Sequence, residues 1–115
     1  MRTDRLRLQD ILEAIGEVLD TTPGTRAEFE ASKLVRSHLA RNIQIVGEAA
    51  NRLSKPLKDQ HPEIPWRMIA GMRHVIVHGY YQIDWNEVFD TAKRDIPSLK
   101  PLIEALLSSL PDEQP

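Results

Sequence analysis

Apolar residues recur at intervals of three and four along almost the whole chain, and this spacing is typical of α-helices that bury one face. The first helix is expected to begin after Thr3, a suitable N-cap, and to end at the Thr-Thr-Pro-Gly run of residues 21–24. Its apolar positions are Leu8, Ile11, Leu12, Ile15, Val18 and Leu19. No segment alternates apolar and polar residues with a period of two, so the pattern predicts no β-strand.

A long second helix is predicted from Thr25 to just before Pro56. Thr25 and Glu28 have the spacing of a capping box, in which two side chains satisfy free N–H groups at the start of a helix. The apolar residues of this stretch are Leu39, Ile43, Val46, Ala50 and Leu53. Their alternating spacing of four and three forms a packing seam, so this helix is expected to be the backbone of a bundle.

The second half of the chain predicts further helices. A rigid connector rich in proline precedes a third helix, which is expected to run from about Pro65 to about His78. Asp84 is expected to cap a fourth helix, and Pro97 to interrupt it or restart it. A last apolar stripe contains Leu99, Leu102, Ile103, Leu106 and Leu107.

These elements predict an all-α fold, a four- to five-helix up-and-down bundle. Residues 1–110 are expected to form a single domain, and residues 111–115 a loose C-terminal tail. The chain has 115 residues, 41% apolar and 28% charged, which is ordinary for one globular domain.

Charge and cysteine content exclude several classes of function. The net charge is −2, so no strong overall positive field indicates a nucleic-acid-binding protein. There are no cysteines, which excludes disulfides, thiol nucleophiles and cysteine-based zinc sites. Neither a membrane span nor a signal peptide is predicted, because no apolar run approaches about 18 residues and acidic residues recur near the N-terminus. A cytoplasmic location is expected.

The predicted helix over residues 66–78 carries the chemistry. On a helical wheel its apolar residues span about 220°, far more than a surface helix needs, so it is expected to be central and packed on more than one side. The remaining ribbon holds Arg67, Gly71, His74 and His78. Gly71 is expected to allow close approach of another backbone or of a ligand.

Arg73 projects into the apolar arc of this wheel. Because a guanidinium cannot lose its charge, it needs a carboxylate, a subunit partner or a phosphate there. Glu48 on the second helix is a candidate ion-pair partner. A purely structural ion pair is the simplest alternative for Arg73, and His78 can equally be explained as a complement to the helix dipole. A zinc site at His74 and His78 is disfavoured, because the chain lacks cysteine and a His-Glu-x-x-His motif.

Residues 72–80, with the sequence MRHVIVHGY, resemble the Arg-x4-His-x-Tyr signature of HepT-like toxins in the HEPN (higher eukaryotes and prokaryotes nucleotide-binding) superfamily. His74 occupies the polar position that follows the arginine. The similarity extends from about Arg5 to about Leu107, and further matching landmarks are Gly47-Glu48-Ala49, Ile64-Pro65-Trp66, Asp84 and Asp95-Ile96-Pro97.

This resemblance implies a homodimeric ribonuclease toxin of a type VII-like toxin–antitoxin pair, which cuts RNA (tRNA or mRNA) without a metal or other cofactor. It implies Arg73 and His78 as catalytic residues, supported by His74, and Arg67 is a candidate RNA-binding residue. The partner would be an MntA-like nucleotidyltransferase antitoxin, which uses ATP to attach AMP to the signature tyrosine, here Tyr80. No membrane or DNA partner is expected.

Elementary chemistry is compatible with these roles. Metal-free RNA cleavage needs a base for the ribose 2′-hydroxyl, an acid for the departing 5′-oxygen and positive charge at the phosphate. On a straight helix, however, Arg73 and His78 would lie about 140° apart and about 7.5 Å along the axis. A homodimer through this helix would bring both signatures into one cleft. The alternative is a non-catalytic helical module that binds a nucleotide or a nucleotidyltransferase partner.

Overall fold

The computed structural model describes residues 2–74 and 83–111 of the chain, and within these ranges every regular element is helical. The α-helices are α1 (Asp4–Thr21), α2 (Arg26–Ala31), α3 (Lys33–Asn51), α4 (Lys55–Gln60), α5 (Trp66–Gly71), α6 (Trp85–Asp90) and α7 (Ile96–Ser109). A 3₁₀ turn (Met72–His74) follows α5, and a π-helical turn (Thr91–Asp95) joins α6 to α7. The predicted all-α helical bundle is confirmed.

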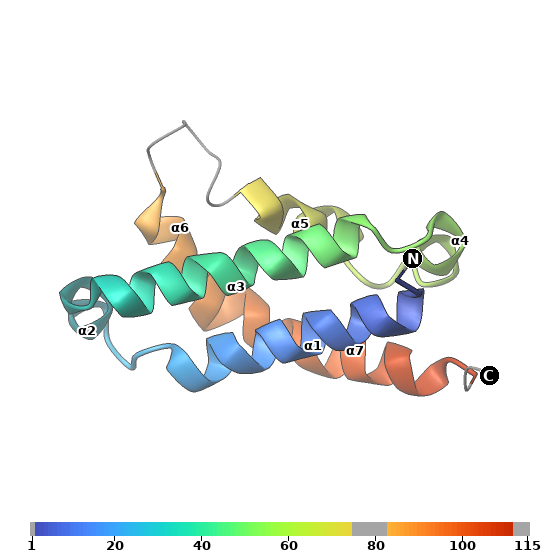
Figure 1. Ribbon diagram of the computed structural model, residues 1–115, viewed down its shortest axis with the longest axis horizontal. Coiled ribbons are helices and arrows are strands. Elements are labelled where there is room, and N and C mark those ends of the chain that lie inside the picture. Colours follow the sequence, from blue (N-terminus) through green and yellow to red (C-terminus); the bar gives the residue numbers. More distant parts are fainter. Residues whose placement is uncertain (1, 75–82, 112–115) are drawn as a thin grey trace.

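The two long helices α1 and α3 lie side by side in opposite directions and form the scaffold of the molecule (Figure 1). Helix α7 packs along α1, whereas α5 and the 3₁₀ turn pack on α3. The short helices α2 and α4 lie at opposite ends of the scaffold (Figure 1). The segment that carries the predicted chemistry is therefore supported chiefly by α3.

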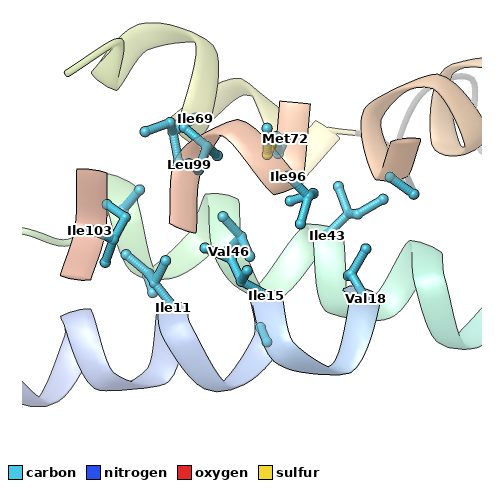
Figure 2. Packing of buried hydrophobic residues seen from close by; sticks show 14 of the residues in the cluster. Ile11, Ile15, Val18, Ile43, Val46, Ile69, Met72, Ile96, Leu99 and Ile103 are labelled. Atoms are coloured by element: carbon cyan, nitrogen blue, oxygen red, sulfur yellow. The ribbon is translucent and has the colours of Figure 1, made fainter. Parts of the chain in front are cut away.

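The predicted stripes form the core. All five residues of the stripe on α3 and the turn after it are buried, and Figure 2 shows side chains of α1, α3, α5 and α7 meeting in one cluster. The most completely buried large side chains include Phe29, Leu8, Ile11, Ile15, Leu39, Ile43, Ile69, Ile96, Leu99 and Ile103. Burial of this apolar surface is the main force that holds the helices together.

The predicted N-caps are confirmed at three helices. The hydroxyl of Thr3 accepts a hydrogen bond from the backbone N–H of Leu6 at 3.1 Å, and Asp84 accepts one from Glu87. The hydroxyl of Thr25 accepts from the backbone N–H of Glu28 at 3.2 Å. Each cap satisfies a donor that the first turn of a helix leaves free.

Two boundaries differ from the prediction. The long second helix is interrupted at Ser32, whose backbone is extended and whose hydroxyl accepts from the N–H of Val35. A serine hydroxyl that bonds the backbone locally favours a cap over continuation of the helix.

Helix α4 was not predicted, and Pro56 lies in its first turn, where a missing N–H costs nothing. Its N-cap, Ser54, donates backbone N–H and hydroxyl to the carboxylate of Asp4, at 2.9 and 2.6 Å.

The interruption expected at Pro97 takes the form of the π-helical turn. Pro97 has no N–H to donate, and its ring would crowd the carbonyl of the residue four positions earlier in an α-helix. The chain instead widens by one residue, so that the N–H of Ile96 donates to the carbonyl of Thr91. Helix α7 then continues through Pro101 to Ser109.

The beginning of α1 and the end of α7 are joined by one side chain. The guanidinium of Arg5 donates to the carbonyl oxygens of Leu110 and Pro111, at 3.1 and 2.8 Å. Apart from Pro111, the expected C-terminal tail lies outside the described residues. In the described part of the chain, no helix combines the length and the apolar character needed to cross a bilayer.

Candidate functional site

The α-helix that bears the candidate residues is shorter than predicted. Helix α5 ends at Gly71, and the next residues form the 3₁₀ turn, in which the N–H of Met72 donates to the carbonyl of Ile69. His78, Gly79, Tyr80 and Tyr81 lie outside the described residues. The described part of the candidate site therefore consists of α5, the 3₁₀ turn and the elements that pack against them.

One side of the predicted apolar arc is covered, and another is not. Ile69 and Met72 are buried among side chains of the core, as Figure 2 shows. Met68 is 42% exposed, although it belongs to the same arc. Within the described residues of one chain, α5 packs mainly on α3, so packing of this helix on a further side stays a prediction.

Arg73 occupies a different environment from the one predicted. Its side chain is half-buried, next to the exposed His74, and its Nε donates to Nε2 of that histidine at 3.4 Å. The helical wheel assumed a continuous α-helix, whereas Arg73 lies in a 3₁₀ turn, in which each residue advances by about 120° and not about 100°. The guanidinium therefore lies at the edge of the core and not within it.

The candidate ion pair between Glu48 and Arg73 is not present in the described part of the chain. Glu48 instead lines a groove of about 600 Å³ between α1 and α3, together with Arg7 and Arg52. Successive residues of a helix point about 100° apart, so Glu48 faces the α1 side while Gly47 faces the 3₁₀ turn. Within residues 2–74 and 83–111, no carboxylate lies within ion-pair distance of Arg73.

The close approach of two backbones occurs at Gly47 and not at Gly71. A Cβ atom at Gly47 would lie 2.2 Å from the backbone nitrogen of Arg73 and 2.8 Å from the carbonyl carbon of Met72. Gly71 has no atom within 4 Å of the corresponding position and is exposed. Sequence reasoning missed this role of Gly47. The available signal was a glycine inside the apolar seam of a long helix, which often indicates close packing.

Arg67 lies on the exposed side of α5, beside a small pocket of about 190 Å³. The pocket is also lined by Gly71 and by Glu87, Thr91 and Asp95 from α6 and the π-helical turn. Arg67 therefore lies beside two carboxylates of the pocket wall, and this pocket does not include Arg73.

The described residues contain no cluster of three metal-ligating side chains. The disfavoured zinc pair of His74 and His78 includes His78, which lies outside the described ranges. The groups that the structure does place at the site are a guanidinium, an imidazole and a second arginine. Groups of these kinds can bind phosphate and transfer protons.

Comparison with known proteins agrees with this chemistry. A family model described as ribonuclease HepT-like matches residues 11–106. The chain is 38% identical over 106 residues to a protein of Thermococcus cleftensis named "Probable ribonuclease HepT", covering 91% of this chain and 96% of the relative. It is 31% identical over 104 residues to "Putative RNase MJ1216" of Methanocaldococcus jannaschii, covering 90% and 86% of the two chains. Among solved structures, none matches the chain significantly.

An all-helical fold that places an arginine beside a histidine thus defines a small helical protein with groups of the kinds that phosphate chemistry uses. The chain belongs to the HepT-like ribonuclease family, because the family model covers most of its length. This membership confirms the resemblance inferred from the sequence. Its relatives carry names that indicate ribonuclease activity at the level of the family.

Proposed function

We propose that this protein is a metal-independent RNA endonuclease in which Arg73 and His78 are the catalytic residues and His74 supports them. The observation that carries the proposal is the state of Arg73. Its guanidinium is half-buried at the surface, and its one side-chain hydrogen bond within the described residues goes to a histidine and not to a carboxylate. An arginine held this way can bind a phosphate without first breaking an ion pair.

The proposed reaction begins with loss of the proton from the ribose 2′-hydroxyl to a base. The 2′-oxygen then forms a bond to phosphorus, the bond from phosphorus to the 5′-oxygen breaks, and an acid gives that oxygen a proton. An imidazole serves either task near neutral pH, which suits His78, with His74 as the second proton carrier. Arg73 stabilises the negative charge that builds on the phosphate oxygens.

The exposed part of α5 supports a homodimer as the active form. Met68 is 42% exposed on the same short helix that carries Arg67. A twofold axis beside this helix would cover Met68 and bring two copies of Arg73 and His78 toward one cleft. Arg67 would lie at the rim of that cleft, where a positive charge attracts RNA phosphates.

Family membership supports a toxin role, in which this protein is the RNase of a type VII-like toxin–antitoxin pair. Its partner would be an MntA-like nucleotidyltransferase that uses ATP to attach AMP to Tyr80. The added phosphate would repel the RNA backbone and compete with it for Arg73. The expected substrate is tRNA or mRNA.

The proposal is tested by incubating the purified protein with tRNA and with mRNA in the presence of EDTA. Wild type should cleave at least one of them, and His78→Ala should lose cleavage while it remains folded by circular dichroism. Cleavage that stops with EDTA and returns with zinc would contradict the metal-free mechanism. If wild type cleaves no RNA and still binds a nucleotide or a nucleotidyltransferase, the alternative of a non-catalytic binding module replaces this proposal.

A further inference from the structure

Gly47 stands out among the glycines of the described residues. The backbone of the 3₁₀ turn fills the space that a side chain at this position would occupy. The three atoms nearest to a methyl group placed there are the nitrogen of Arg73 at 2.2 Å, the carbonyl carbon of Met72 at 2.8 Å and Cα of Arg73 at 2.9 Å. All three are backbone atoms, so no side-chain rotation relieves the overlap. Gly16, Gly24 and Gly71 have no atom within 4 Å of this position.

The opposite side of the same turn is held by Met72. Its side chain is only 4% exposed and enters the core (Figure 2). Gly47 itself lies on α3, next to the fully buried Val46, so the surface that the turn contacts is part of the rigid scaffold. Gly47 and Met72 together form what we call the Arg73 support: one lets the backbone approach α3, and the other fixes the turn in the core.

We propose that Gly47 is a positioning residue for the reaction, which sets the place of the Arg73 guanidinium by determining how closely its backbone approaches α3. The inference rests on the proposed function, because it assigns the consequence of this contact to RNA cleavage. Alanine differs from glycine only by its methyl group. At Gly47 the absence of that methyl group allows the 3₁₀ turn to lie against α3.

The size of the expected effect follows from the distances. Ordinary contacts of a Cβ atom begin at 3.4 Å, so the Gly47→Ala methyl group would push the nitrogen of Arg73 away by about 1 Å. A misplacement of about 1 Å at a catalytic group typically lowers the rate about 100-fold. Helix propensity acts in the other direction, since alanine favours the interior of α3 more than glycine does.

The experiment compares Gly47→Ala with Gly16→Ala, its matched control in α1. The rate constant kcat and KM are measured on an RNA that wild type cleaves, and backbone amide shifts of Arg73 and His74 are recorded by ¹H–¹⁵N NMR. Gly47→Ala should remain folded, lose about 100-fold in kcat with KM changed only a few-fold, and shift both amides. Gly16→Ala should leave kcat, KM and both amide shifts unchanged. A folded Gly47→Ala protein with wild-type kcat or with unmoved amides would overturn the proposal.

A second pair of variants covers the case in which Gly47→Ala does not fold. Met72→Ala removes the other half of the Arg73 support without adding an atom, and Met72→Leu keeps the buried volume. We expect Met72→Ala to lower kcat, and Met72→Leu to keep kcat near that of wild type. Equal kcat values for wild type and a folded Met72→Ala protein would overturn the inference. If wild type itself cleaves no RNA, the proposed function fails. The NMR shifts then still decide whether the Arg73 support sets the position of the Arg73 backbone.

Discussion

The side chain of Arg73 donates from Nε to Nε2 of its chain neighbour His74, with 3.4 Å between the two nitrogens. The terminal guanidinium nitrogens of Arg73 form no side-chain hydrogen bond within residues 2–74 and 83–111. They are the groups that can bind two phosphate oxygens together.

Replacement of Arg73 by alanine should separate catalysis from stability. We expect RNA cleavage to fall by about 100- to 1,000-fold, as for the loss of one donor that stabilises transition-state charge. The free energy of unfolding should change by about 1 kcal/mol or less, because the side chain is half-exposed and forms no ion pair within the described residues. Cleavage assays and urea denaturation measure the two quantities. A loss of about 3–5 kcal/mol would instead indicate a buried structural ion pair.

Tyr80 should be the target of the partner enzyme. Incubation with a cognate nucleotidyltransferase and ATP is expected to add AMP to Tyr80 and to stop cleavage, because the added phosphate repels RNA. Tyr80→Phe should keep nuclease activity and escape this inhibition. Tyr81→Phe is the control, and it should still be modified and inhibited. Peptide mass spectrometry locates the AMP groups; modification of Tyr81 alone, or inhibition without any modification, would contradict the prediction.

Introduction of a charge at Met68 should weaken the proposed dimer. A glutamate there would have to lose its hydration to enter the interface, so Met68→Glu should shift the protein toward monomer and lower RNA cleavage with it. Leu34→Glu is a matched control, because Leu34 is 82% exposed near the start of α3. Analytical ultracentrifugation gives the oligomeric state. Equal dimer content in the two variants would argue against an interface at α5.

Asp4 should contribute to stability by joining the start of α1 to the start of α4. Its carboxylate accepts both the N–H and the hydroxyl of Ser54, and hydrogen bonds to charged groups contribute about 1.5–3 kcal/mol each. Because both hydrogen bonds are only partly buried, water replaces part of what is lost, so Asp4→Ala is expected to lower the free energy of unfolding by about 2 kcal/mol in total, measured by urea denaturation. Asp59→Ala breaks the exposed pair with Lys55 and should leave the free energy of unfolding almost unchanged. Similar losses in both variants would contradict this interpretation.

The raised pKa of Lys55 follows from the same exposed pair. The side-chain hydrogen bond and the charge of Asp59 both favour the protonated amine. Stability from this pair would be present below the ordinary pKa of lysine and would be lost as the pH rises through the raised value. Near neutral pH the lysine is charged in the folded and unfolded states, so titration of this pair should leave stability unchanged there.

Periodicity was sufficient to predict the helices and their buried stripes, because burial of one helix face is a property of local sequence. Ile43 and Val46 were predicted to belong to the packing seam, and both are fully buried. The helix start at Ser32 was harder to predict, because a serine can occupy a helix or cap it. In the structure its backbone is extended, and Ser32 is the N-cap of α3. The apolar pattern alone carries no information about that choice.

The site depended on geometry that a helical wheel cannot supply. The wheel assumes a constant rotation per residue and says nothing of neighbouring helices, whereas Arg73 lies half-buried in a 3₁₀ turn that packs on α3. Contacts between distant segments were equally out of reach, since nothing local relates Gly47 to Arg73. The resemblance to a family supplied what local patterns did not, namely which arginine and which histidine to consider together.

The pairing of α1 with α7, closed by Arg5 at the carbonyls of Leu110 and Pro111, has a consequence for synthesis on the ribosome. The ribosome synthesises α1 and α3 before α7. Their common apolar surface is therefore uncovered until Leu99, Ile103 and Leu106 of α7 pack on it. The nascent chain therefore exposes its incomplete core until α7 has left the exit tunnel. The helices that support α5 and the 3₁₀ turn therefore gain their full packing only after α7 has been synthesised.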